Sequence, residues 1–103
     1  MNERPPPPPL ARDELKRLRK SAHHLEPVVR VGVRGVTDAV IASVDEALER
    51  HELIKVRLAE PEDKRAMADE LATRSGAALC GLIGHTAILF RPRAEDPAPS
   101  SRK

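Results

Sequence analysis

The sequence is almost without aromatic side chains, with one Phe and no Trp or Tyr in 103 residues. Modules that recognise nucleic acids by stacking bases on exposed aromatic rings are therefore nearly excluded. Phe90 stands in an alternating apolar segment, where we expect it to pack in the core. Any ligand of this chain must be held by charge, backbone amides or aliphatic surface.

Cysteine is equally scarce. Cys80 is the only one, so an intrachain disulfide is excluded, and its apolar neighbours predict a buried side chain rather than a nucleophile. No Cys/His cluster has metal-site spacing, and the sequence has no glycine-rich nucleotide-binding loop. We predict no cofactor, no metal and no enzymatic activity.

Long apolar runs are also missing. No segment approaches the ~20 apolar residues that a membrane span needs, and the N-terminus has no apolar signal core. We therefore expect a cytoplasmic protein without a membrane partner. Five prolines at 5–9 favour extended polyproline II, and the mixture of Pro, Ser and charge near the C-terminus is typical of disorder. We expect disordered segments at 1–9 and 94–103 around one monomeric domain at 10–93.

The charges that are present are separated along the chain. In total there are 18 Lys/Arg and 16 Asp/Glu, a net charge of +2. Residues 12–34 hold seven Lys/Arg against three Asp/Glu, whereas residues 36–75 hold six against ten. This separation suits a phosphate-binding face on a balanced body, and it suits ordinary solvated helix surfaces just as well.

Hydrophobic periodicity predicts an α/β fold. The order α-β-α-β-α-β-β predicts a two-layer sandwich, in which the helices cover one face of a four-stranded mixed sheet. Leu15, Leu18, Ala22 and Leu25 form the expected apolar stripe of the first helix, and Thr37, Gly76 and Gly84 have the residue types of an N-cap, a C-cap and a hairpin turn. Helices are expected at about 11–23, 38–50 and 62–75, and strands at 28–31, 53–58, 77–83 and 86–90.

One segment, Gly32-Val33-Arg34-Gly35, combines several features of an anion site. Its glycines allow another backbone to approach closely, and the helix expected to begin at Thr37 presents free N–H groups and a positive dipole end. Arg34 adds a guanidinium that matches phosphate geometry. KH domains clamp nucleotide backbone with a loop of this form. A G-x-x-G loop alone is more simply explained as a plain strand-to-helix turn, but Arg34, Arg30, the helix start and the adjacent basic helix together favour a nucleic-acid clamp.

The order of several short motifs resembles the CRM domain, found alone in bacterial YhbY-like proteins. The matching pieces are Ala22-His23, Leu25, Pro27-Val28-Val29, Gly32, Gly35, Thr37, Ala47-Leu48, His51-Glu52-Leu53-Ile54-Lys55-Val56, Gly84, Thr86 and Phe90-Arg91-Pro92. The resemblance spans about residues 12–92. It implies a fold similar to the C-terminal domain of bacterial translation initiation factor 3, RNA binding through residues 32–35, and association with precursors of the large ribosomal subunit. Glu26 and Phe90 depart from the basic residue and the Tyr that are common in the family.

The leading hypothesis is therefore an RNA-binding assembly factor that acts on precursor large-subunit ribosomal RNA in a pre-ribosomal particle. DNA binding stays open, because the loop does not exclude deoxyribose. The alternative is a protein-interaction adaptor that uses the proline run and the acidic second and third helices. The candidate RNA-binding residues are Gly32, Val33, Arg34, Gly35, Thr37, Arg30, Lys16, Arg19 and Lys20, with Lys55, Arg57 and Arg91 as weaker candidates.

Overall fold

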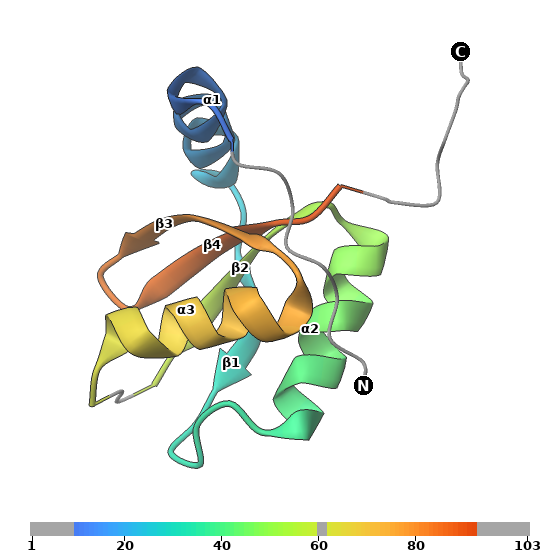
Figure 1. The fold of residues 1–103 in the computed structure, drawn as a ribbon, viewed down its shortest axis with the longest axis vertical. Helices are drawn as coiled ribbons and strands as arrows, with labels where there is room; N and C mark the ends of the chain where they lie inside the picture. The colour runs from blue at the N-terminus through green and yellow to red at the C-terminus, as the bar shows by residue number, and fades with distance from the viewer. Residues whose placement is uncertain (1–9, 60–61, 93–103) are drawn as a thin grey trace.

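Helices and strands alternate in the predicted order within residues 10–59 and 62–92, the part of the chain that the computed structural model describes (Figure 1). The proline run and the C-terminal segment lie outside these residues. The elements are α1 (Arg12–Ala22), β1 (Pro27–Val31), α2 (Asp38–Arg50), β2 (Leu53–Leu58), α3 (Lys64–Ser75), β3 (Ala78–Ile83) and β4 (Thr86–Phe90). The predicted α/β class and element order are confirmed.

The four strands form one mixed sheet in the order β1-β2-β4-β3. β1 runs parallel to β2, whereas β2 with β4 and β3 with β4 are antiparallel pairs. A parallel pair needs a crossover connection, and α2 supplies it between β1 and β2. β1 and β3 are the edge strands.

The predicted caps account for where the helices begin and end. The Thr37 side chain accepts a hydrogen bond from the Val40 amide at the start of α2. The start of α3 lies two residues later than predicted, because Asp63 is its N-cap and accepts a bond from the Ala66 amide. Gly76 ends α3 with a φ of 69°, and Gly84 turns the β3–β4 hairpin with a φ of 60°, a backbone region that glycine occupies readily.

The main core lies between the sheet and the pair α2–α3. Alternate residues of β2, namely Ile54, Val56 and Leu58, point into it and are buried, as the alternation predicts. Burying each such aliphatic side chain contributes about 1.5–3 kcal/mol. The helices contribute Val44, Leu48, Ala68, Leu71 and Ala72.

α1 packs on the opposite face of the sheet from α2 and α3. Its Ala22 is buried with Cys80 and Ile88 in a second cluster, against which Leu15, Leu18, Leu53 and Phe90 pack. The expectation that all helices cover one face is therefore wrong for α1. Leu25 lies beyond the end of α1 and is 38% exposed, so it does not extend the helix stripe as expected.

α1 leaves part of its face of the sheet open. The strand register aligns Arg30 with Arg57, Arg57 with Thr86, and Thr86 with Ile83, one residue from each strand. Aligned residues share a face, and residues two apart along a strand share it too. Thr86 is two residues from Ile88, which packs in the α1 cluster, so this row faces the α1 side. Arg30, Arg57 and Ile83 are exposed, and we call these four residues the open row.

Candidate nucleic-acid interface

The Gly32–Gly35 loop is a tight turn between β1 and α2. The Gly35 amide donates to the Gly32 carbonyl over 3.0 Å, and the Thr37 amide donates to the Gly35 carbonyl over 3.1 Å. Val33 and Arg34, at the tip of the turn, are exposed, and Val33 is 82% exposed. The loop thus presents backbone, one aliphatic side chain and one guanidinium to solvent.

The two glycines of the loop differ in what the fold requires of them. Gly35 has a φ of +79°, a conformation that L side chains rarely adopt. Gly32 has no such angle, and a Cβ built on it meets no atom within 4 Å. The local fold gives no reason for glycine at position 32, whereas close approach of an external group would give one.

The start of α2 has one feature that favours an external anion and one that opposes it. The Thr37 hydroxyl caps the Val40 amide at 3.1 Å, and the helix dipole favours negative charge there. Asp38 already places a carboxylate at this end, and Arg74 binds it at 2.7 Å. Arg74 also donates to the Val36 carbonyl over 2.7 Å, so this guanidinium joins the loop to α3 and offsets the charge of Asp38.

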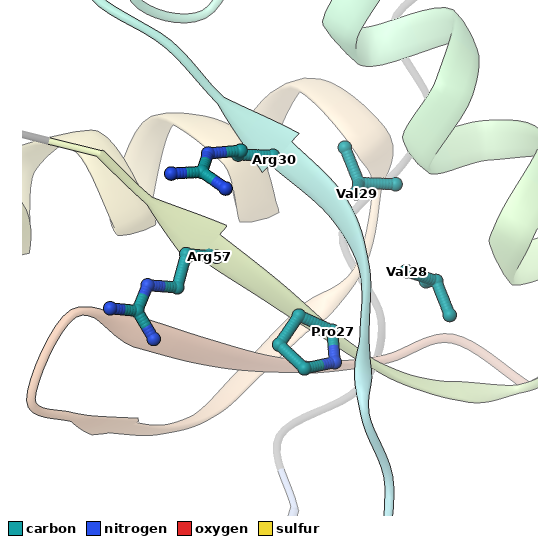
Figure 2. A pocket seen from close by; sticks show the side chains of 5 residues that line it. All are labelled: Pro27, Val28, Val29, Arg30 and Arg57. Atoms are coloured by element: carbon teal, nitrogen blue, oxygen red, sulfur yellow. The ribbon is translucent and has the colours of Figure 1, made fainter.

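Arg30 and Arg57 are the basic half of the open row. Figure 2 shows their side chains extending to the same side from the neighbouring strands β1 and β2, beside Pro27. Arg30 precedes the loop by one residue, since β1 ends at Val31. These two guanidinium groups therefore continue the charge of Arg34 onto the sheet.

A groove beside α1 extends this basic surface. Arg57 lines the groove together with Lys55, Arg19 and His23, and Glu26 is the one acidic residue in its lining. Lys55 Nζ donates to the Leu25 carbonyl over 3.1 Å, and Arg19 Nη1 donates to the Cys80 carbonyl over 3.0 Å. Arg19 is thereby tied to β3 and shapes the groove. We call the surface formed by Arg34, Arg30, Arg57, Lys55, Arg19 and His23 the basic face.

The arginines of the α2–α3 layer and those of the sheet and the Gly32–Gly35 loop differ in their partners. In the α2–α3 layer, Arg50, Arg65 and Arg74 pair with carboxylates of their own layer. Among the described residues, Arg30, Arg34 and Arg57 have no carboxylate within ion-pair distance. Cations without an internal counter-charge are available to an external polyanion.

The helix α1 does not lie beside the loop in space, although its proximity in the sequence predicts that it would. Figure 1 shows α1 at one end of the molecule and the loop between β1 and α2 at the other. Lys16 and Lys20 are exposed on α1. They therefore belong to the far end of any binding track, and the open row lies between them and Arg34.

Arg91 has a structural role. Its side chain is 11% exposed and binds the Asp45 carboxylate at 2.8 Å. The same guanidinium donates to the Ser75 carbonyl over 2.6 Å and lies 3.5 Å from the Glu49 carboxylate. These contacts join the end of β4 to α2 and the end of α3, and they leave Arg91 poorly placed for a polyanion on the basic face.

Other kinds of site find little support in the described residues. No group of three or more His, Cys, Asp or Glu there could hold a metal ion, and none of the helices there is long and apolar enough to cross a bilayer. Cys80 is buried, as predicted, and burial raises the pKa of its thiol to about 11, so the reactive thiolate is scarce at neutral pH.

The sequence predicted most residues of the basic face but not the aliphatic residues that line the groove. Ile83 and Thr86 enter the site only through strand register, which aligns Thr86 with Arg57 and Ile83 with Thr86. Leu25 enters because the α1–β1 connection leaves it at the groove. The sequence of β4 did indicate that a helix covers the second face of the sheet, since apolar residues at both alternating positions are typical of a strand buried on both faces.

Comparisons with known proteins agree on one family. The model of the CRS1 / YhbY (CRM) domain matches residues 10–91. A Pseudomonas aeruginosa protein named "probable RNA-binding protein" is 40% identical over 93 residues, covering 88% of this chain and 86% of its own length. An RNA-binding protein of Haemophilus influenzae is 40% identical over 88 residues, covering 84% and 89%.

A solved structure supports the same assignment. The solution structure of a Staphylococcus aureus protein superimposes with a TM-score of 0.75 at 29% sequence identity, and the match covers 85% of this chain and 94% of that one. The fold, the motif order and the family match point the same way. The chain belongs to the CRS1 / YhbY (CRM) domain family.

Proposed function

We propose that this chain binds RNA along its basic face and acts on precursors of the large ribosomal subunit. Two relatives at 40% identity have names that describe RNA-binding proteins. The observation that carries the proposal is the separation of the arginines, with Arg30, Arg34 and Arg57 unpaired among the described residues and those of the α2–α3 layer paired. A polyanion would therefore meet unpaired arginines on the side of Arg30 and Arg57 and ion-paired arginines on the side of α2 and α3.

The loop would act as the backbone clamp. An incoming phosphate would accept hydrogen bonds from amides at the tip of the turn, because the Gly35 amide already donates to the Gly32 carbonyl. Neither glycine has a side chain to obstruct its approach. Arg34 would add a charge-assisted bond, which is about twice as strong as a neutral one. Thr37 would hold the start of α2 in place through its bond to Val40.

The open row and α1 would extend the contact beyond the loop. Arg30 and Arg57 would each bind a phosphate on the sheet, and Lys55 would lie further along the groove. Lys16 and Lys20 would reach phosphates at the α1 end. Phosphate contacts of this kind give affinity and register, and they carry no direct sequence information.

A salt titration tests this mechanism. We expect the dissociation constant for a fluorescein-labelled single-stranded RNA, measured by anisotropy, to rise steeply with salt. Five neutralised phosphates give a slope of about −3 to −4 when the logarithm of the association constant is plotted against the logarithm of the salt concentration for a single strand. A nearly flat salt dependence would contradict a charge-based clamp, and competition with the matched DNA strand would measure the preference for ribose.

The ribosomal part of the proposal needs a cellular test. We expect crosslinking of the tagged protein in cells, followed by sequencing of the bound RNA, to recover mainly precursor large-subunit ribosomal RNA. Recovery of mainly messenger or transfer RNA would remove the ribosomal role and leave RNA binding intact.

A further inference from the structure

We propose that the groove between α1 and the open row holds one unstacked nucleobase of the bound RNA. The inference rests on the proposed function, because the same strand would supply the base and the phosphates of the loop clamp. It adds a base-binding subsite to a surface that otherwise contacts phosphates only.

The groove has a defined floor and two walls. Ile88 and Thr86 of β4 line it beside Lys55 and Arg57 of β2. The end of α1 and the connection to β1 form one wall through Arg19, His23 and Leu25, and Ile83 at the end of β3 also borders the groove. The volume is about 410 Å³, within the range of about 300–1,000 Å³ that is usual for small-molecule sites.

The lining combines exposed aliphatic surface with positive charge. Ile83 is 63% exposed and Leu25 is 38% exposed, and both border this one groove. Single exposed aliphatic residues are ordinary on a protein surface, but two of them in the lining of one basic groove offer apolar contact to a flat ring. Arg57 can in addition stack its planar guanidinium on a base.

Arg19 gives this groove its shape. Its aliphatic stem crosses Gly81, where a Cβ would come within 2.9 Å of Arg19 Cδ. The absence of a side chain at Gly81 lets the stem lie flat over β3 while Nη1 reaches the Cys80 carbonyl. The wall nearest α1 is therefore held by contacts inside the domain and exists before any RNA is bound.

Charge and position identify the occupant as a nucleotide of the clamped strand. Arg57 lines both this groove and the depression that contains Arg30, and Arg30 leads directly into the Gly32 loop. A strand that follows these cations passes the mouth of the groove. An apolar peptide would leave Arg57 and Lys55 without a further counter-charge, whereas a nucleotide offers both a ring and a phosphate.

Methyl NMR of the full chain with a single-stranded RNA oligonucleotide tests the subsite directly. A base in the groove shifts nearby methyl resonances upfield through its ring current, so we expect shifts at Ile83 and Ile88. Ile41 and Ile54 are internal controls, because they lie on the α2–α3 side. An oligonucleotide with abasic sites throughout should bind but leave all four methyl resonances without the upfield shift.

Affinity measurements give the second arm. Replacing single bases with abasic sites along the oligonucleotide should weaken wild-type binding about three- to tenfold at one position. This loss equals about 0.7–1.4 kcal/mol, near the low end of what a base stacked on an aromatic side chain contributes. Ile83→Ser should abolish that difference without changing the salt slope. Val28→Ser is the matched control, since Val28 is 52% exposed on β1 and does not line this groove.

The possible failures are distinguishable. Steep salt dependence without any abasic effect or Ile83 methyl shift would overturn the base subsite and leave the proposed function standing. Absence of RNA binding by the wild-type chain would overturn both. Weaker association of Ile83→Ser with pre-ribosomal particles, at unchanged RNA affinity and with no base discrimination, would assign the groove to a protein and overturn the subsite.

Discussion

Arg30 and Arg57 stand side by side across the parallel β1–β2 ladder, so two like charges share one position of the sheet. Like charges directly opposite one another on neighbouring strands destabilise a sheet. The pair therefore has a cost in the free protein, and a phosphate between the two groups would remove it.

Replacing both arginines should weaken RNA binding without harming the fold. For Arg30→Ala/Arg57→Ala we expect an affinity loss of about ten- to hundredfold at moderate salt. The salt slope should become shallower by about 1.4, because each phosphate contact contributes about 0.7. The free energy of unfolding, from urea titration, should stay within about 0.5 kcal/mol or rise.

Arg65→Ala is the matched control for charge. Arg65 pairs with Asp69 on α3, and both groups are exposed. This variant removes a cation from the other layer, so RNA affinity should change less than about threefold. Equal losses in the two variants would mean that net charge, rather than the basic face, determines binding.

The two loop glycines should respond differently to alanine. Gly32→Ala should keep or slightly raise stability, by about 0.4–1 kcal/mol, because the added Cβ meets no atom. It should still lower RNA affinity, because the methyl group stands where a phosphate approaches. Gly35→Ala should cost about 1–2 kcal/mol from its positive φ.

Thermal unfolding and anisotropy on the same samples separate the two effects. Wild-type RNA affinity of Gly32→Ala would show that the backbone at this glycine is not a contact. The RNA affinity of Gly35→Ala must be compared with its stability, because backbone strain and a lost RNA contact both lower binding in this variant.

Arg91→Met should affect stability rather than binding. The substitution removes the bonds to Asp45 and to the Ser75 carbonyl from an 11% exposed site, which should cost about 2 kcal/mol. The RNA salt slope, measured below the unfolding transition, should be unchanged. Arg65→Met, in an exposed pair, should cost less than about 1 kcal/mol. A shallower salt slope for Arg91→Met would show that Arg91 contacts an RNA phosphate.

Cys80 should be protected from alkylation in the folded protein. Burial raises the pKa of its thiol to about 11 from a usual value of 9.0, so the unfolded chain releases this proton at lower pH. Stability from this group is present below about pH 9 and falls as pH rises from 9 to 11. Iodoacetamide labelling at pH 8, followed by mass spectrometry, should be slow in buffer and fast in denaturing urea. Rapid labelling of the folded chain would contradict the burial.

The sequence predicted local structure well because local chemistry decides it. Thr37 fixed the start of α2, and the alternation of Ile54, Val56 and Leu58 identified the buried face of β2. Periodicity reveals that α1 has an apolar stripe but not which face of the sheet receives it. The side that α1 occupies depends on packing against Cys80 and Ile88, far along the chain.

The candidate site shows the same division. Glycine spacing and the position of Arg34 identified the loop without any tertiary information. The roles of Arg19 and Arg91 depend on partners at Cys80 and Asp45, and no pattern near either arginine names those partners. The sequence shows which residues are basic. Only the fold shows which of them lack a carboxylate partner and can bind an external anion.

The contrast between an ion-paired helical layer and an unpaired basic face has a kinetic consequence. An excess of uncompensated positive charge on one side exerts a torque on the domain as it diffuses towards a polyanion, and turns that side forward before contact. Such steering raises the association rate, and added salt removes the gain. The uneven charge would shorten the search for a docking orientation on a large RNA.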